Sequence, residues 1–157
     1  MVVGLKGLTS NAKKSSIDEL NSCLADAISL SRAIKQAHWN CKGINFIAVH
    51  ELFDTVNDRL EDQIDTMAER IQVLDGVAIG TVEDVAKNTS LKPYPTDLTK
   101  TQDHIRAICE RMRDYGEKVR KAVDSTDEAG DVGTSDLLTG ASREADKDLW
   151  FLESQLE

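Results

Sequence analysis

The chain has 157 residues, 40% of them hydrophobic but only 4% aromatic, and a formal net charge of −9. This length suffices for one domain with a sizeable core, and the acidic balance argues against a protein that coats DNA by attraction to phosphate. Ala, Leu and charged residues are abundant while Pro is rare, which predicts an all-α protein.

Cysteine usage and the N-terminal sequence indicate the compartment. The three cysteines are widely separated and lack CxxC spacing, so we expect reduced thiols rather than disulfides or a zinc site. The N-terminal stretch MVVGLKGLTSNAKK lacks the apolar region of a signal peptide, and no later run approaches the roughly 18 apolar residues that a membrane span requires. We therefore expect a cytoplasmic protein with no membrane contact.

The first helix is predicted from apolar residues that recur at helical spacing. Residues 1–15 lack this periodicity, so we expect a short flexible arm there and a single bundle domain over residues 16–157. The helix would cover about residues 16–42 and begin where the Ser16 hydroxyl and the Glu19 carboxylate form a capping pair.

Three further long helices follow. An uninterrupted apolar pattern covers residues 46–75, and a long connection over residues 76–98 contains both prolines and one short helical segment, TVEDVAKN. A third helix is expected from a Thr99–Gln102 capping pair, and a fourth after the acidic segment DSTDEAGDVGTSD. Short links on either side of one long crossover predict a ferritin-like four-helix bundle; an up-down-up-down bundle with an enlarged middle loop is the alternative.

Polar residues on the second predicted helix form two pairs at metal-ligand spacing. His50 and Asp54 are four residues apart, as are Asp65 and Glu69, so the members of each pair lie on the same side of the helix, beside its core face. The spacing from Asp54 to Asp65 corresponds to roughly 16 Å along the helix axis, whereas the two ions of a dinuclear centre lie only about 4 Å apart. One chain therefore carries two separated halves of a metal site.

Two copies of the chain would unite these halves. If this helix packs against its own copy around a two-fold axis, antiparallel alignment brings the early pair of one subunit to the late pair of the other, and His38 on the neighbouring helix supplies a further nitrogen. The alternatives are a hydrogen-bonded core histidine at position 38 and a solvated helix face for the carboxylates. Spacing alone does not decide between these interpretations.

The complete pattern resembles the Dps family, the DNA-binding proteins from starved cells or mini-ferritins. The matching features span nearly the whole chain: His38-Trp39-Asn40, His50 and Asp54 at family spacing, DTMAERIQVLDG from Asp65 to Gly76, and the terminal helix TSDLLTGASREADKDLWFLESQL. The resemblance implies a ferritin-like bundle with a short helix in its crossover, assembled into a hollow dodecamer of 23 symmetry.

The same resemblance implies a ferroxidase centre at each two-fold interface, with iron bound by His38, His50 and Asp54 of one subunit and by Asp65 and Glu69 from the partner. Members of the family oxidise Fe(II) with hydrogen peroxide or O2 and store ferric mineral in the cavity. This iron storage protects DNA and the cell from oxidative damage.

Two further roles follow from position in the family pattern. Trp39 matches a tryptophan that intercepts stray oxidising equivalents, with interface packing as the alternative. Asp127, Asp131 and Asp136 precede the last helix, where the family has acidic three-fold pores that attract cations, although acidic residues at this place also serve as helix caps.

Some residues depart from the family pattern. The arm has only three lysines and the C-terminus is acidic, so DNA binding is doubtful and nucleoid association is not favoured. A non-catalytic, DNA-associated structural shell protein is the alternative function. Cys41 lies close to the predicted site and is expected to be buried, while His104 matches no ligand and is assigned to the surface or an interface.

Overall fold

The computed structural model describes residues 5–156, and within them the chain forms five α-helices and no strand. Four are long and one is short: α1 Ser10–Asn40, α2 Phe46–Val73, α3 Val82–Asn88, α4 Thr101–Glu128 and α5 Val132–Glu153. The predicted all-α, ferritin-like bundle with a short helix in its crossover is confirmed. None of the helices in the described range is long and apolar enough to span a membrane.

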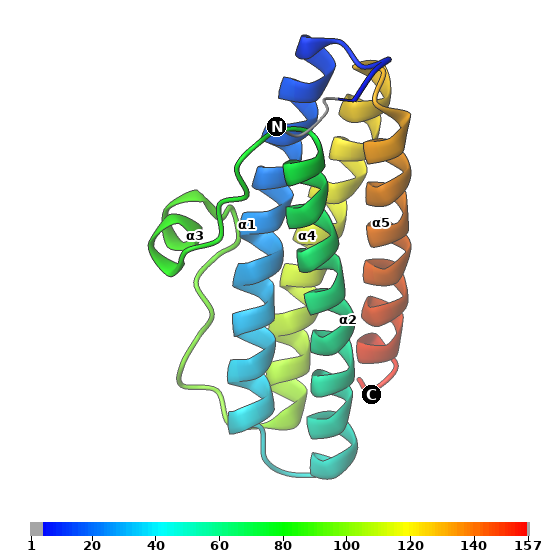
Figure 1. The fold of residues 1–157 in the computed structure, drawn as a ribbon. Helices are drawn as coiled ribbons and strands as arrows, with labels where there is room; N and C mark the ends of the chain where they lie inside the picture. The colour runs from blue at the N-terminus through cyan, green and yellow to red at the C-terminus, as the bar shows by residue number, and fades with distance from the viewer. Residues whose placement is uncertain (1–4, 157) are drawn as a thin grey trace.

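The course of the chain distinguishes between the two bundle topologies. Figure 1 shows α1 and α2 joined at one end of the bundle, and α4 and α5 joined at the opposite end. The crossover, which contains α3, returns along the side of the bundle, so α2 and α4 run in the same direction. A parallel pair of this kind needs the long connection and excludes the up-down-up-down alternative.

A single hydrophobic core extends through the four long helices. The apolar residues that recur at helical spacing are almost completely buried in all four helices, for example Leu24, Phe53, Ile105 and Leu138. Full burial of such a side chain contributes roughly 1.5–3 kcal/mol to the free energy of unfolding. Phe46, where the apolar pattern of the second predicted helix starts, lies in the first turn of α2 and is 38% exposed.

α1 begins at Ser10 rather than at Ser16, so residues 10–15, which were expected to belong to a flexible arm, are helical. The Thr9 side chain caps the helix by accepting a hydrogen bond from the Ala12 N–H at 3.0 Å, whereas Ser16 is buried inside the helix. Too few apolar residues fall before Ser16 to reveal a period, although Ala12 is also buried. Residues 1–4 of the predicted arm lie outside the described part of the chain.

The start of α4 is attached to the α1–α2 link by main-chain hydrogen bonds. The Lys42 N–H donates to Thr99 O at 2.8 Å, and the Thr101 N–H donates to Lys42 O at 3.0 Å. Lys100 occupies the N-cap position without a side-chain hydrogen bond, so the predicted Thr99–Gln102 capping pair is wrong. These bonds place the beginning of α4 beside the segment that carries His38 and His50.

One buried carboxylate anchors the crossover to the bundle. Asp26 on α1 accepts hydrogen bonds from Thr89 Oγ1 at 2.8 Å, from Ser90 N and Oγ at 2.7 and 2.6 Å, and from Lys118 Nζ on α4 at 2.8 Å. Burial alone would raise the pKa of Asp26, but the bonds from Lys118, Ser90 and Thr89 hold it below its ordinary value. Asp26 therefore stays ionised and connects α1, α4 and the crossover.

Candidate metal centre

His38 and His50 form a reciprocal pair where α1 ends and α2 begins. Nδ1 of His38 lies 2.8 Å from the backbone oxygen of His50, and Nδ1 of His50 lies 2.8 Å from the backbone oxygen of His38. The two rings stack with their centroids 3.7 Å apart. His38 is 8% exposed and is thus a hydrogen-bonded, buried histidine.

The hydrogen bonds assign the tautomer of both rings. A carbonyl oxygen only accepts, so each Nδ1 must carry the hydrogen. In the neutral imidazole the lone pair is then on Nε2, the atom that can bind a metal ion, and a hydrogen bond from the other ring nitrogen is the usual way of orienting a histidine ligand. Burial of His38 and availability of its Nε2 are therefore compatible.

Asp54, one turn after His50, lies next to this pair. Its Oδ1 is 3.6 Å from His38 Nε2 and accepts a hydrogen bond from Lys35 Nζ at 2.6 Å. The hydrogen bond from the Lys35 ammonium holds the pKa of Asp54 below its ordinary value, so the carboxylate is ionised. The structure brings together three of the five predicted ligands.

Asp65 and Glu69 lie near the other end of α2. Both are exposed, and no ion pair within residues 5–156 involves either one. Because α2 is continuous from Phe46 to Val73, Asp65 is roughly 16 Å from Asp54 along the helix axis, as the sequence predicts. Asp65 and Glu69 therefore do not contact Asp54. Among residues 5–156, no three His, Cys, Asp or Glu side chains are placed so that one copy of the chain could hold a metal ion.

Several large apolar side chains are exposed around the histidine pair. Trp39 is 63% exposed, and Ile44 and Ile47 are 84% and 59% exposed. Lys35 Nζ lies 6.0 Å from the centre of the Trp39 ring, at the limit of a cation–π contact. An apolar cluster of this kind beside a polar site is typical of a surface that another protein molecule covers.

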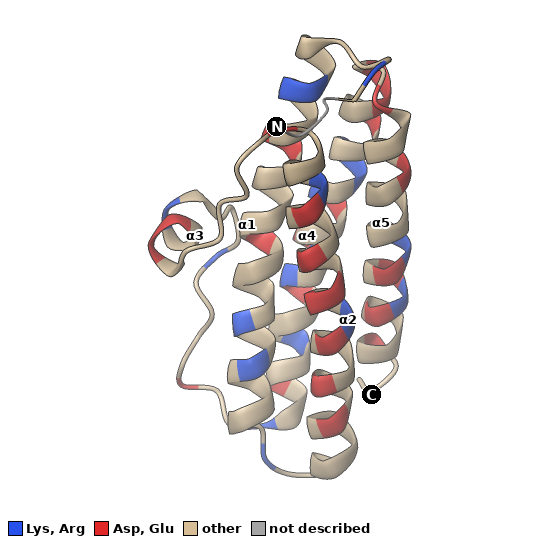
Figure 2. Ribbon diagram, viewed as in Figure 1, with Lys and Arg blue, Asp and Glu red and all other residues tan. Residues whose placement is uncertain are grey.

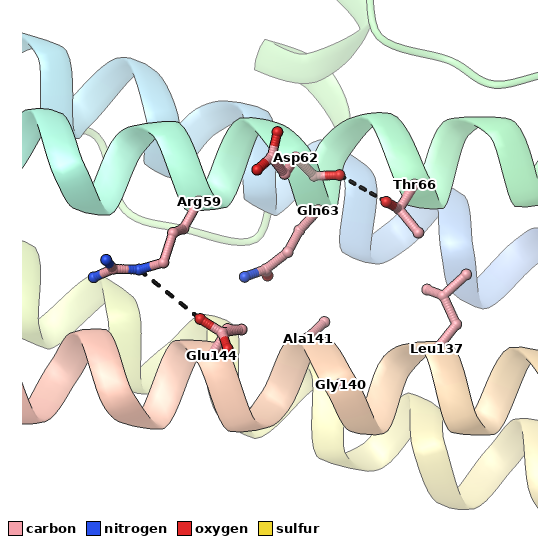
Figure 3. Close-up of a pocket in the computed structure, with 8 residues that line it drawn as sticks. All are labelled: Arg59, Asp62, Gln63, Thr66, Leu137, Gly140, Ala141 and Glu144. Carbon is pink, nitrogen blue, oxygen red and sulfur yellow. Dashed lines mark hydrogen bonds and ion pairs between the residues drawn. The ribbon is translucent and has the colours of Figure 1, made fainter.

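The remaining polar surface of α2 is strongly acidic. Figure 2 shows Asp and Glu residues following one another along the helix. A groove of about 280 Å³ separates α2 from α5, and Figure 3 shows Arg59 on one wall facing Glu144 on the other, with their charged atoms 3.9 Å apart. None of the five predicted ligands lines this groove.

The three aspartates assigned to a pore are placed differently from one another. Asp131 is buried, caps α5 through the Thr134 N–H at 3.0 Å, and pairs with Arg70 at 2.8 Å, so within one copy of the chain it presents no exposed carboxylate to a pore. Its function is to join the end of α2 to the start of α5. Asp127 and Asp136 are exposed and stay candidates for a cation path.

Sequence reasoning missed one neighbour of the site, Lys35, and the hydrogen bonds that orient the two histidines. Lys35 is one helical turn before His38, a spacing that places both on one side of α1, so the pattern could have indicated it. The hydrogen bonds from each histidine ring to the backbone oxygen of the other had no sequence signal, because they depend on how α1 and α2 pack together.

Cys41 is buried as predicted, whereas His104, assigned to the surface or an interface, is only 1% exposed.

Comparisons with known proteins agree with this architecture. A family model described as a ferritin-like domain matches residues 17–157. The DNA protection during starvation protein of Agrobacterium fabrum is 50% identical over 150 residues, covering 96% of this chain and 93% of that protein.

Two solved structures are similar over nearly their full lengths. DpsC from Streptomyces coelicolor has a TM-score of 0.93 at 31% identity, over 97% of this chain and 89% of that chain. A Dps protein from Vibrio cholerae O1, described as a member of a broad superfamily of ferritin-like diiron-carboxylate proteins, has a TM-score of 0.91 at 26% identity, over 100% of this chain and 98% of that chain.

Proposed function

The chain belongs to the Dps family of ferritin-like proteins, and we propose that it is a ferroxidase that oxidises Fe(II) with hydrogen peroxide and stores the ferric product within a hollow shell of twelve copies. Fe(II) and peroxide are its substrates, and O2 is the alternative oxidant. Removal of Fe(II) and peroxide would protect DNA and the cell from oxidative damage without direct DNA binding, which the net charge of −9 opposes.

The reciprocal His38–His50 pair is the observation that carries the proposal. It leaves two Nε2 atoms without a hydrogen and holds one of them 3.6 Å from an ionised Asp54. Imidazole nitrogen binds Fe(II), while hard carboxylate oxygens favour Fe(III), so this donor set fits an ion that is bound reduced and released oxidised.

The centre is completed by a second copy of the chain. Asp65 and Glu69 are exposed, have no ion-pair partner in the described range and lie on the same helix as His50 and Asp54. Antiparallel packing of two α2 helices around a two-fold axis would place the two halves opposite each other, and the exposed Ile44 and Ile47 would be covered by the same contact.

The protein's own residues have distinct roles in the proposed reaction. The histidines and carboxylates hold Fe(II) close to peroxide; two Fe(II) supply two electrons, which with two protons convert one peroxide into two waters. When both Fe(II) ions are bound, both electrons come from one centre and no hydroxyl radical is released; a centre that holds a single Fe(II) gives only one electron and does release the radical. Lys35 keeps Asp54 ionised before Fe(II) arrives and must move when Asp54 becomes a ligand.

The test compares the His50→Ala/Asp54→Ala double variant with Glu51→Ala/Asp62→Ala, which removes two exposed carboxylates from the same helix. We expect the first variant to assemble normally in size-exclusion chromatography but to oxidise Fe(II) with peroxide at least tenfold more slowly, in line with losses of about 10–100-fold for weakened metal sites. The control should oxidise Fe(II) at the wild-type rate. Unchanged oxidation in the first variant would favour the non-catalytic shell protein.

A further inference from the structure

Tyr94 in the crossover and His104 near the start of α4 form a hydrogen-bonded pair outside the proposed metal centre. The Tyr94 hydroxyl lies 2.7 Å from His104 Nδ1, and His104 Nε2 lies 3.1 Å from Leu98 O. His104 is 1% exposed and Tyr94 is half-buried. The five proposed ligands do not include either residue.

The direction of this hydrogen bond is determined by Leu98. Its carbonyl oxygen only accepts, so His104 Nε2 carries the hydrogen, Nδ1 has the lone pair, and the Tyr94 hydroxyl must donate. Burial lowers the pKa of His104, although Leu98 O, the Asp103 charge and the backbone of Asn40 partly offset this effect. The phenolic proton of Tyr94 is thus directed at the neutral imidazole of His104. If His104 takes this proton, Leu98 O and Asp103 are close enough to stabilise its positive charge.

Arg111 constrains what Tyr94 can do. Its guanidinium carbon lies 4.9 Å from the centre of the Tyr94 ring and is held there by hydrogen bonds to Lys92 O, Ala107 O and Pro93 O. A fixed positive charge over the ring disfavours a second positive charge on the ring itself. Removal of an electron from Tyr94 therefore requires that its proton leave as well, and His104 Nδ1 is in position to accept it.

The pair lies at the same end of the bundle as the histidine pair. The backbone of Asn40, two residues after His38, faces His104, and the Lys42–Thr101 main-chain bond connects the α1–α2 link to the start of α4. The Cys41 thiol is near enough to Tyr94 for a charge on its sulfur to influence the hydroxyl. An oxidant formed near His38 would therefore have Tyr94 within the same packed region.

The chain's other tyrosine provides an internal contrast. Tyr115 is completely buried, but its hydroxyl donates to the side-chain oxygen of Gln63 at 3.3 Å. A carboxamide oxygen accepts a hydrogen bond without taking the proton, so Tyr115 has no base. Tyr115 is the more deeply buried of the two, so the proton acceptor, and not burial, distinguishes Tyr94.

We infer that Tyr94 is a redox-active tyrosine, with His104 as its proton acceptor, that reduces hydroxyl radicals escaping from the iron centre. In this step Tyr94 gives one electron to the hydroxyl radical, which becomes hydroxide, and its proton passes to His104 Nδ1, leaving a neutral tyrosyl radical and an imidazolium. Fe(II) then returns an electron, becoming Fe(III), and the proton returns to the Tyr94 oxygen. The net reaction is hydroxyl radical plus Fe(II) to hydroxide plus Fe(III).

The source of the radical in this inference rests on the proposed function, so the experiment has two arms. In the first, iron-free protein is oxidised with azidyl radicals; in the second, Fe(II)-loaded protein is mixed with hydrogen peroxide, and both samples are frozen rapidly for electron paramagnetic resonance. Ring-deuterated tyrosine identifies a tyrosyl signal. Wild type and Tyr115→Phe should give the signal in both arms, and Tyr94→Phe should lose it.

His104→Gln tests the proton acceptor, because an amide can hydrogen-bond with Tyr94 and Leu98 but does not take a proton. We expect several-fold slower radical formation and a changed solvent isotope effect in this variant. A radical on Tyr115 alone, or an unchanged signal in Tyr94→Phe, would overturn the inference. If the wild-type protein forms a Tyr94 radical with azidyl but does not oxidise Fe(II) rapidly with peroxide, the Tyr94–His104 couple is upheld and the proposed ferroxidase function is contradicted.

Discussion

His38 and His50 each direct Nδ1 at the other's backbone oxygen, both at 2.8 Å. This exchange joins the last turn of α1 to the N-terminal part of α2 and leaves Nε2 of both rings free of a hydrogen in the neutral form. One pair of contacts thus holds two helices together and prepares two donor atoms, so removal of either ring affects both stability and metal binding.

The first prediction separates these two effects. His38→Ala should lower the free energy of unfolding by about 2–4 kcal/mol, because the variant loses buried ring packing and leaves carbonyl groups with fewer partners. Asp54→Asn, which keeps the size of a half-exposed side chain, should change it by less than about 0.5 kcal/mol. Both should slow Fe(II) oxidation. Urea unfolding measures the stability of the two variants, and an Fe(II) oxidation assay measures their activity. Equal losses of stability in His38→Ala and Asp54→Asn would contradict the double role of His38.

The second prediction concerns Lys35, whose ammonium lies 2.6 Å from Asp54. Lys35→Met removes the cation that competes with a metal ion for this carboxylate, so we expect several-fold tighter binding of Zn²⁺, a redox-inert probe, at neutral pH. The control is Lys14→Met, which removes an exposed lysine at the far end of α1. Calorimetric titration measures the affinity, and weaker binding in Lys35→Met would show that the lysine supports the site.

The pH dependence of this effect has a definite sign. Lys35 keeps the pKa of Asp54 below the ordinary value for an aspartate. In the wild type the carboxylate therefore stays ionised even when the pH falls to that ordinary value. Without Lys35 the pKa should rise, and the gain in metal affinity should shrink on acidification because protons then compete for Asp54.

The third prediction tests the shared centre directly. His50→Ala/Asp54→Ala and Asp65→Ala/Glu69→Ala should each be inactive alone, since each destroys half of every site. When the two variants are unfolded together and refolded as a mixture, random pairing should restore about one quarter of the sites, because half of the dimers are mixed and each of these has one intact site. Recovery of peroxide-dependent Fe(II) oxidation is the measurement. No recovery, with normal assembly, would contradict a centre divided between subunits.

The fourth prediction concerns Asp26, which anchors the crossover. Asp26→Asn leaves Lys118 without its buried counter-charge and should lower the free energy of unfolding by about 3–5 kcal/mol at neutral pH. Asp18→Asn is the control, because its ion pair with Lys14 is exposed. Denaturant unfolding of both variants gives the comparison, and similar small losses would show that the crossover is held by other contacts.

Asp26 also predicts how stability responds to acid. Its pKa is below the ordinary value of 3.8, so its contribution is complete above that pH and is lost as the pH falls through the lower pKa of the folded state. The difference in stability between wild type and Asp26→Asn should therefore decrease on acidification.

The helix pattern was predictable because helical periodicity needs only local spacing. Leu24, Phe53 and Ile105 belong to the apolar repeats from which three of the helices were predicted, and all three are buried. The ends of helices were less predictable: Ser16 and Thr99 are good capping residues, but Thr9 and Lys100 occupy the N-cap positions. Capping depends on where tertiary contacts allow the helix to start, and both misplaced starts lie in segments with few apolar residues.

The candidate site was partly predictable for the same reason. His50 and Asp54 share one helix, so their spacing reveals them, whereas the stacking of His38 on His50 depends on the packing of two helices. Asp131 shows the opposite error. An acidic residue in a loop suggests a surface, but Arg70, which lies 61 positions earlier in the chain, pairs with it in the interior.

The main-chain bonds of Lys42 with Thr99 and Thr101 connect two chain reversals at one end of the bundle. One of these amide hydrogens lies in the α1–α2 link and the other at the first residue of α4, positions without an intrahelical partner that would ordinarily exchange with deuterium quickly. Both are held by carbonyls from a distant part of the chain. Slow exchange at Lys42 and Thr101 is therefore expected, and this end of the molecule should open only when α1, α2 and α4 separate together.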